Sequence, residues 1–300
     1  MVRDYGTKNW IDWCPGCGNF GIVSSLYRAF SDMGLDPKNT VLVGGIGCSG
    51  KMPHFVDVNG VHTLHGRAIP FATGIKLANP DLNVIVNGGD GDLLGIGAGH
   101  LVALGRRNLD ILVMLHDNRV YGLTKGQASP TLPENTQTKA LSSPNIQGAV
   151  KPLQLALTSG FTHVGRSFAM DSDHLTQMIK DGIEHDGAAF LDILQPCVTY
   201  NDIHTSDYFK ENIERLEEER KNDIDDIPTA FKKSKIGEKI PLGVFYTETE
   251  KETFTERFSN RIPNYIKKPP VDQVSKERKK SVLDKKSFES TFGEHFIQTK

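Results

Sequence analysis

The sequence lacks long hydrophobic runs and carries almost no excess charge. No stretch of about 18 uninterrupted apolar residues, the length that a transmembrane helix needs, occurs in the chain. Residues 1–6 do not form the charged and then apolar segment of a secretory signal, so we expect a cytoplasmic protein. A net charge of −2 gives no reason to expect binding to nucleic acid or to a membrane surface.

Cysteine is scarce as well, with four residues in the chain. In a cytoplasmic chain of this size, disulfide bonds are not the first expectation. Cys14 and Cys17 form a CxxC pair whose spacing lets two thiolates face one metal centre, and Cys48 and Cys197 can complete a set of four. Four thiolates suit tetrahedral zinc or an iron–sulfur cluster, while unrelated buried thiols are the alternative. The C-x2-C-x2-C-x3-C run of a built-in ferredoxin domain is missing.

The first 200 residues alternate between short apolar runs and amphipathic segments, which is typical of an α/β fold. The apolar runs predict strands at residues 40–44, 82–87, 110–116, 161–164 and 190–194. The segments between them predict helices at residues 18–33, 66–78, 94–107 and 172–185. Uniformly apolar strands separated by helices favour a doubly wound, mostly parallel sheet that is covered on both faces. The polar residues 122–152 predict a long loop that is functional or mobile.

The character of the chain changes after residue 200. Residues 207–222 predict a charged amphipathic helix, and the remainder is interrupted by proline, lysine and glutamate. Residues 201–250 carry 13 acidic and 8 basic side chains, whereas residues 251–300 carry 7 acidic and 12 basic ones. We therefore expect one α/β domain over 1–205, followed over 206–300 by an irregular arm that packs on this domain or on a partner.

Two glycine-rich turns each follow a predicted strand and suggest phosphate binding. Residues 45–52 nearly form the nucleotide loop G-x4-G-K-S/T, but Met52 stands where a hydroxyl is needed to bind Mg²⁺. Residues 89–95 resemble a dinucleotide turn with a different spacing, and Asp90 and Asp92 would repel a pyrophosphate unless a divalent cation lay between them. The sequence therefore disfavours both an ATPase and a dinucleotide-binding enzyme.

A bound magnesium ion would explain the two carboxylates. Mg²⁺ prefers an octahedron of oxygen ligands and often shares a diphosphate with the protein. Asp90 follows one predicted strand and Asn118 follows the next, so a parallel sheet brings both side chains to its carboxyl edge, where α/β folds bind ligands. The carbonyl of Val120 can complete the protein's ligands, and the amides of Gly91 and Asp92 at a helix start can bind phosphate oxygens.

These features resemble a known family. Gly-Asp-Gly at residues 89–91, followed after about 25 residues by Asn118, resembles the thiamine diphosphate signature. Three further motifs accompany it, namely WCPGCG at residues 13–18, GCSGK at residues 47–51 and TLHGRA at residues 63–68. Together they resemble the β subunit of 2-oxoacid:ferredoxin oxidoreductases over about residues 10–200, and more loosely at residues 241–246.

The resemblance implies a thiamine diphosphate domain that carries magnesium and one [4Fe–4S] cluster. The implied cluster ligands are Cys14, Cys17, Cys48 and Cys197. The implied magnesium ligands are Asp90, Asn118 and the carbonyl of Val120. The implied contacts of the organic cofactor are Ile46, Gly47, Ser49, His65, Gly91, Asp92, Gly122 and Leu123.

The resemblance also implies a reaction, in which a 2-oxoacid loses CO₂, two electrons leave singly through the cluster to ferredoxin, and coenzyme A takes the acyl group. We expect His65 to donate a hydrogen bond to a developing oxyanion and Lys51 to anchor the substrate carboxylate, with mere support of the turns as the alternative for both. Lys125 could meet coenzyme A phosphates, although a solvated lysine is the simpler interpretation. Pyruvate, 2-oxoglutarate and a broad range of substrates stay open.

The glutamate that protonates the aminopyrimidine of thiamine has no counterpart in this sequence. In the family it belongs to the α subunit, so the resemblance implies an obligate heteromer in which this chain alone is inactive. The basic tail at residues 251–300 could bind acidic ferredoxin or the partner subunit. Two other functions stay open, a non-oxidative thiamine diphosphate decarboxylase or synthase subunit and a zinc-stabilised nucleotide-binding protein.

Overall fold

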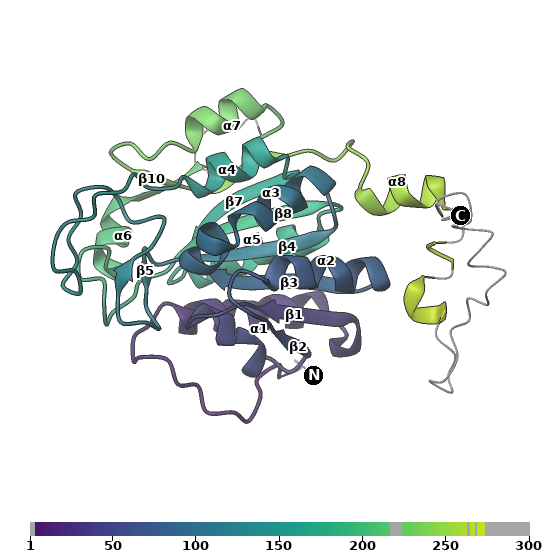
Figure 1. Ribbon diagram of the computed structural model, residues 1–300, viewed down its shortest axis with the longest axis horizontal. Helices are drawn as coiled ribbons and strands as arrows, with labels where there is room; N and C mark the ends of the chain where they lie inside the picture. The colour runs from purple at the N-terminus through teal and green to yellow at the C-terminus, as the bar shows by residue number, and fades with distance from the viewer. Residues whose placement is uncertain (1–3, 217–223, 263–264, 268, 274–300) are drawn as a thin grey trace, which may run out of the picture.

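A central sheet organises the fold in the computed structural model, which describes residues 4–216, 224–262, 265–267 and 269–273. Its strands are β1 Thr40–Gly44, β2 Asn59–His62, β3 Asn83–Gly89, β4 Ile111–Asp117, β7 His163–Phe168, β8 Ala188–Leu194, β9 Ile213–Arg215 and β10 Ile240–Thr247. They lie in the order β2-β1-β3-β4-β8-β7-β10-β9 (Figure 1). Neighbours are parallel except β7 and β10. The predicted doubly wound, mostly parallel sheet is confirmed.

Helices cover both faces of this sheet. The helices α2 Ala68–Ala78, α3 Ala98–Arg107 and α4 Pro152–Ser159 pack on one face, and α1 Asn19–Met33 and α5 Ser172–Glu184 pack on the other (Figure 1). Successive strand residues alternate between the two layers: Val41 and Val43 belong to the core under α2 and α3, and Leu42 to the core under α1 and α5. Burial on both faces explains why the strands are uninterrupted apolar runs.

Shorter elements complete the described chain. A hairpin of β5 Val120–Tyr121 and β6 Gln127–Ala128 follows β4, and a π-helical turn, η3 Gly91–Ile96, follows β3. The remaining elements are η1 Pro37–Asn39, η2 Ser49–His54, α6 Ser206–Asn212, α7 Ile227–Lys233, α8 Phe254–Arg261 and η5 Pro270–Gln273. Among the described residues, none of the helices combines the length and the apolar character that crossing a membrane requires.

The strands and helices predicted before residue 200 all occur, with ends displaced by up to four residues. The largest displacement of a helix start is at the helix predicted over 94–107, because α3 begins only at Ala98. The preceding turn is π-helical, and Gly95 within it has non-helical dihedral angles (φ −82°, ψ −107°) that separate it from α3. The chain therefore makes a wider turn at the end of β3 before a regular helix starts.

The prediction of a helix over residues 207–222 is wrong about where this helix ends. α6 ends at Asn212, and the next residues form β9, in which Ile213 pairs with Ile240 of β10. Pairing with a distant strand outweighs the local helical pattern, which a short charged segment supports only weakly. Residues 217–222 lie outside the described residues. β10 was not indicated by sequence patterns, and the division into 1–205 and 206–300 stays a prediction.

Candidate functional site

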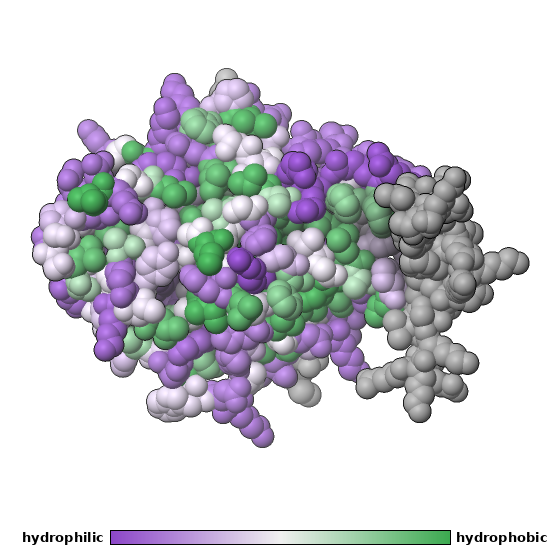
Figure 2. Space-filling view, viewed as in Figure 1, coloured by the Kyte–Doolittle hydropathy of each residue, from purple (hydrophilic) through white to green (hydrophobic). Residues whose placement is uncertain are grey.

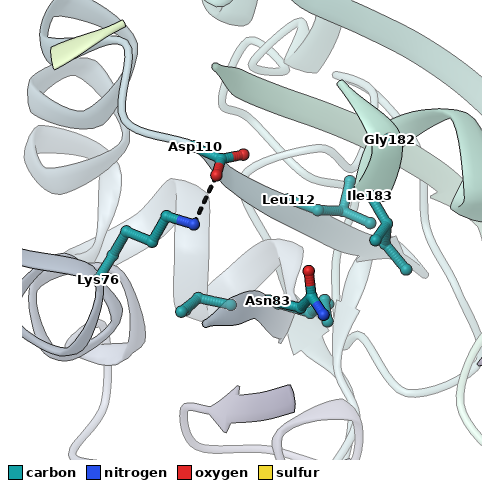
Figure 3. A pocket seen from close by; sticks show the side chains of 8 residues that line it. Lys76, Asn83, Asp110, Leu112, Gly182 and Ile183 are labelled. Carbon is teal, nitrogen blue, oxygen red and sulfur yellow. Dashed lines mark ion pairs between the residues drawn. The ribbon is translucent and has the colours of Figure 1, made fainter. Parts of the chain in front are cut away.

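A cavity of about 180 Å³ opens at the carboxyl ends of β1, β3 and β4. All eleven residues that were predicted to hold the organic cofactor or magnesium line it, although their roles stay predictions. They are Ile46, Gly47, Ser49, His65, Asp90, Gly91, Asp92, Asn118, Val120, Gly122 and Leu123. At the opposite end of β3 and β4 there is a crevice of about 10 Å³, where Lys76 pairs with Asp110 at 2.5 Å (Figure 3). We call the larger space the cofactor cavity.

The side chain of Asp92 holds the wall of the cofactor cavity together. Its Oδ1 accepts hydrogen bonds from the amides of Ile46 (3.1 Å) and Gly66 (2.8 Å) and lies 2.6 Å from Nδ1 of His65. Gly45 makes this contact possible, because a Cβ there would lie 1.8 Å from Oδ2 of Asp92. The carboxylate of Asp92 therefore binds two turns of the protein, whereas the sequence had indicated a charge that a bound cation would offset.

Of the two predicted catalytic residues, His65 lines the cavity and Lys51 does not. A carboxylate oxygen can only accept, so the short contact with Asp92 assigns a proton to Nδ1 of His65 and leaves Nε2 for other partners. Lys51 instead pairs with Asp12, with Nζ 2.7 Å from Oδ2, and this hydrogen bond lowers the pKa of the Asp12 carboxyl. Lys125, in a left-handed turn with φ of 79°, is also outside the cavity wall.

Two buried carboxylates, Asp90 and Asp117, lie close together at the ends of β3 and β4. Oδ2 of Asp90 accepts hydrogen bonds from the hydroxyls of Ser129 and Thr131, and Oγ1 of Thr131 also lies 2.6 Å from Oδ1 of Asp117. Burial, and to a lesser extent the charge of Asp117, raises the pKa of Asp90 to about 7. Within the described part of the chain, neither carboxylate forms an ion pair with a lysine or arginine. A hard cation would offset the uncompensated charge, so the donor set fits magnesium.

The amide of Asn118 is held in one orientation at the edge of the same cavity. Its Oδ1 accepts a hydrogen bond from the amide of Val120 at 3.0 Å, and its Nδ2 donates to Oε1 of Gln195 at 2.8 Å. Between them, Arg119 adopts a left-handed conformation with φ of 65°. This turn brings both Asn118 and Val120 into the wall of the cofactor cavity, where the sequence had predicted them as oxygen ligands.

The four cysteines converge beside the cofactor cavity. A Cβ on Gly122 would lie 3.8 Å from Sγ of both Cys48 and Cys197. Burial, and to a lesser degree the neighbouring thiols of Cys197, Cys48 and Cys14, raises the pKa of Cys17 to about 12. In the described part of the chain, no three His, Cys, Asp or Glu side chains are arranged to hold a single metal ion. A [4Fe–4S] cluster is larger than one ion and is bound by four more widely spaced thiolates, so this convergence fits a cluster.

Several residues of the site were missed by sequence reasoning. Ser129 and Thr131 lie in the polar segment 122–152 and reach Asp90, and Gln195 contacts Asn118 and Cys17. In the sequence, Asp117 stands out only as the residue before Asn118. The position of Asp117 at a strand end could have indicated it, but nothing local distinguishes these hydroxyls and this amide from ordinary surface residues.

The fold and the site define the class of protein. A parallel sheet with a carboxylate-lined cavity at its strand ends is the arrangement expected of a thiamine diphosphate domain. Residues 45–193 match the family described as "Thiamine pyrophosphate enzyme, C-terminal TPP binding domain". Residues 197–261 match the carboxyl-terminal part of the "Pyruvate ferredoxin oxidoreductase beta subunit". The second match covers α6 and β10, which lie in the segment predicted to be an irregular arm.

Comparison with individual proteins narrows this class. The chain is 50% identical to "2-oxoacid:ferredoxin oxidoreductase 1, subunit beta" of Aeropyrum pernix over 100% of its own length and 98% of that protein. It is also 50% identical to "2-oxoacid:ferredoxin oxidoreductase subunit beta" of Saccharolobus solfataricus, over 92% of this chain and 94% of that one. The chain therefore belongs to the family of 2-oxoacid:ferredoxin oxidoreductase β subunits.

A solved structure shares the fold. It is the 2-oxoglutarate:ferredoxin oxidoreductase from Magnetococcus marinus with 2-oxoglutarate, coenzyme A and succinyl-CoA bound. The TM-score is 0.82 at 37% sequence identity, and the match covers 86% of this chain and 89% of the other. The similarity therefore extends over most of the sheet and its helices and supports the resemblance stated from the sequence motifs.

Proposed function

We propose that this chain is the β subunit of a coenzyme A-dependent enzyme that oxidatively decarboxylates a 2-oxoacid to acyl-CoA and CO₂ and passes the electrons to ferredoxin. The observation that carries the proposal is that eleven predicted cofactor residues line one cavity and that Cys48 lies in the same wall. A single turn, residues 46–49, would then contact both the organic cofactor and the cluster. The path for electrons between the two groups would be short.

The chain's own residues would hold three groups. The amides of Gly91 and Asp92 at the start of η3 would bind phosphate oxygens. Asp90, Asn118 and the carbonyl of Val120 would ligate magnesium, and the four cysteines would ligate one [4Fe–4S] cluster. When bound, thiamine diphosphate supplies a nucleophilic carbon and an electron sink, and the cluster accepts electrons one at a time.

His65 and Asp92 together would place a proton next to the substrate in the cofactor cavity. The carboxylate of Asp92 accepts a hydrogen bond from the Nδ1–H of His65, and this contact fixes the orientation of the ring. When the ring carries a second proton on Nε2, it can donate that proton to an oxyanion that develops on the substrate. Lys51 would anchor the substrate carboxylate only by exchanging its present partner Asp12 for it.

A partner subunit would complete the site. The relatives are named as β subunits, and the sequence offers no counterpart of the glutamate that thiamine chemistry needs. The exposed apolar side chains Leu64 (73%), Phe71 (52%), Ile96 (56%) and Val102 (41%) lie on or beside α2 and α3. Figure 2 shows apolar surface in the middle of the face on which these helices lie. We call these four residues the apolar face and propose that it is covered by the partner subunit.

The proposed function is tested on the complex of this chain with its natural partner, purified without oxygen. We expect about four iron and four sulfide per chain, from the composition of one [4Fe–4S] cluster, and a visible absorbance that is bleached by a 2-oxoacid and coenzyme A. Pyruvate and 2-oxoglutarate are compared as separate substrates. Ferredoxin reduction is followed in the same samples.

The matched control is the variant Cys197→Ser, which removes one proposed ligand and keeps the size of the side chain. We expect loss of the visible absorbance with retention of thiamine diphosphate binding, because the cofactor cavity is otherwise unchanged. A colourless wild-type complex that contains zinc would overturn the proposal. A complex with bound cofactor that releases CO₂ without reducing ferredoxin would instead indicate a non-oxidative decarboxylase.

A further inference from the structure

A second cavity, of about 500 Å³, lies beside the cofactor cavity. The segment that follows β4 separates the two spaces. Asn118 and Val120 line the cofactor cavity, whereas Asp117 and Arg119 line the second one. The rest of its wall comes from the polar loop, the start of α4, β7, residues 204 and 208 before and in α6, and residues 234–236.

Basic side chains outnumber acidic ones in the wall of the second cavity, so we call it the basic cavity. Its basic residues are Arg119, Lys151, Arg166 and Lys235, and its acidic residue is Asp117. One of these cations is already neutralised, because Nε of Arg166 donates to Oδ2 of the buried Asp192 at 2.8 Å. Lys151 and Lys235 are exposed at the rim. The charge that remains is positive.

Arg119 is the least compensated of these cations. The residue is only 5% exposed, and its Nε is buried without a hydrogen-bond partner among the residues that the structure describes. It forms no ion pair within the described ranges of the chain, and its guanidinium carbon lies 5.5 Å from the ring centroid of Phe209. Burial and then the charge of Arg119 lower the pKa of His204, another wall residue, to about 3. A buried guanidinium without an ion pair is costly, and the wall carries four basic side chains against the single carboxylate of Asp117, so the cavity favours an anion.

The amino end of α4 faces the same space. Pro152, Leu153 and Gln154, the first residues of this eight-residue helix, line the basic cavity. The preceding residue, Lys151, makes no capping hydrogen bond with its side chain. Amide N–H groups in the first turn of a helix have no partner within the helix, and the helix dipole favours an anion there. The amino end of α4 therefore favours an anion independently of Arg119.

We propose that the basic cavity binds an oxyanion of the phosphate class, held by Arg119, by the first turn of α4 and by Lys151 and Lys235 at the rim. A phosphate group offers several acceptor oxygens and matches the fork of a guanidinium. The group could come from inorganic phosphate or from a phosphate ester such as coenzyme A, since the cavity is larger than one ion. This inference does not depend on the proposed function, because none of the predicted cofactor residues lines the basic cavity.

The experiment measures the binding of inorganic phosphate to the complex of this chain with its natural partner by isothermal titration calorimetry. Titration in sodium chloride of equal ionic strength gives the non-specific background. We expect saturable binding that the double variant Lys151→Ala/Lys235→Ala weakens at least tenfold. The matched control is Lys210→Ala/Lys232→Ala, which removes two lysines outside the wall of the basic cavity and should keep the affinity. All four substitutions are at the surface, so the variants should fold.

Competition identifies the source of the phosphate group. If coenzyme A displaces phosphate, and the Lys151→Ala/Lys235→Ala variant weakens both, the ligand is a phosphate ester. If phosphate binds and coenzyme A does not displace it, the ligand is the free anion. Absence of saturable phosphate binding, or equal affinity in the two double variants, would overturn the proposal.

Discussion

At the scale of single residues, the side chain of Gln195 joins two predicted ligands that belong to different groups. Its Oε1 accepts a hydrogen bond from Nδ2 of Asn118 at 2.8 Å. Its Nε2 donates to Sγ of Cys17 at 3.4 Å and to the carbonyl of Pro196 at 2.7 Å. Because the carbonyl end can only accept and the amino end can only donate, these partners set the orientation of the amide. Gln195 is therefore a positioning residue between the proposed magnesium and cluster sites.

We predict that Gln195→Leu lowers the reduction potential of the cluster. A hydrogen bond to a ligand sulfur stabilises the more negative, reduced state, so its loss favours the oxidised one. One bond worth about 1 kcal/mol corresponds to a shift of about 40 mV for a one-electron couple. A redox titration of the anaerobic complex, followed by electron paramagnetic resonance, measures the shift.

The control for this prediction is Gln177→Leu, which changes an exposed glutamine on α5 whose Nε2 donates to Asp181. It should leave the potential unchanged. An unchanged potential in Gln195→Leu, at full cluster content, would show that the contact with Cys17 does not influence the cluster.

At the scale of elements, β10 is a buried strand that the local sequence did not indicate. Pro241 and Gly243 interrupt the pattern of a strand, and Gly243 has a φ of 123°. Gly243 pairs with Arg166 of β7 just before the register shifts between Val244 and Tyr246, and Pro241 pairs with Glu214 of β9. Leu242 and Phe245 are nevertheless fully buried. Burial against elements from elsewhere in the chain stabilises a strand whose own sequence is a poor strand former.

We predict that Leu242→Ala lowers the free energy of unfolding by about 2–5 kcal/mol, the cost of removing a buried leucine side chain. Leu242 packs in one cluster with Phe168, Leu194 and Phe209, so residues from both sides of position 205 share a core. Chemical denaturation of the isolated chain measures the loss. The control Ile236→Ala, at a side chain that is 46% exposed, should change stability by less than about 1 kcal/mol.

The same denaturation curves test the expected division of the chain. A shared core predicts one cooperative unfolding transition, which spectroscopic probes placed before and after residue 205 should both report. Two separate transitions would contradict this expectation and would support independent units over 1–205 and 206–300.

At the scale of the whole molecule, the proposal that the partner subunit covers the apolar face can be tested. We predict that Phe71→Glu weakens association with the partner subunit at least tenfold, because a charge would be buried in the interface without a partner. The isolated chain should keep its stability, since Phe71 is 52% exposed there. Analytical ultracentrifugation of the mixed subunits measures the affinity.

The control for assembly is Ile146→Glu, at an apolar side chain that is 86% exposed and belongs to the polar loop instead of α2 or α3. It should not affect association. Equal affinities for the two variants would place the partner on another face.

Buried histidines, among them His163 and His204, couple the stability of the chain to pH. Burial and then the charge of His185 lower the pKa of His163 to about 4, and the pKa of His204 is about 3. An unfolded histidine titrates near 6.5, so below that pH the unfolded chain binds more protons than the folded chain. The free energy of unfolding is therefore highest above about pH 6.5 and decreases as the pH is lowered. At pH 5 the loss is about 2 kcal/mol for each of these histidines.

Urea unfolding at pH 7.5 and pH 5 checks this sign. The variant His163→Gln should show a smaller loss between the two values, because one buried histidine no longer takes up a proton on unfolding. The variant His54→Gln, at an exposed position, should show the full loss. A wild-type chain that is more stable at pH 5 would contradict the prediction.

The sequence by itself determined the five central strands of the sheet, β1, β3, β4, β8 and β7, and most of the cavity wall. Apolar runs of strand length required burial on both faces of the sheet. The carboxyl ends of parallel strands lie at one edge of the sheet regardless of the conformation of the connecting loops. Ile46, Asp90 and Asn118 come directly or almost directly after β1, β3 and β4, so their meeting followed from strand order alone. Short motifs at these positions were sufficient to indicate the family.

Only the tertiary structure decided which distant side chains support those residues. Thr131 reaches Asp90 across 41 positions, and Gln195 reaches Cys17 across 178. The basic cavity likewise joins Arg119 to Lys235. Local periodicity indicates which face of an element a residue occupies, but not which neighbour it meets, because that depends on how loops and helices pack over the finished sheet.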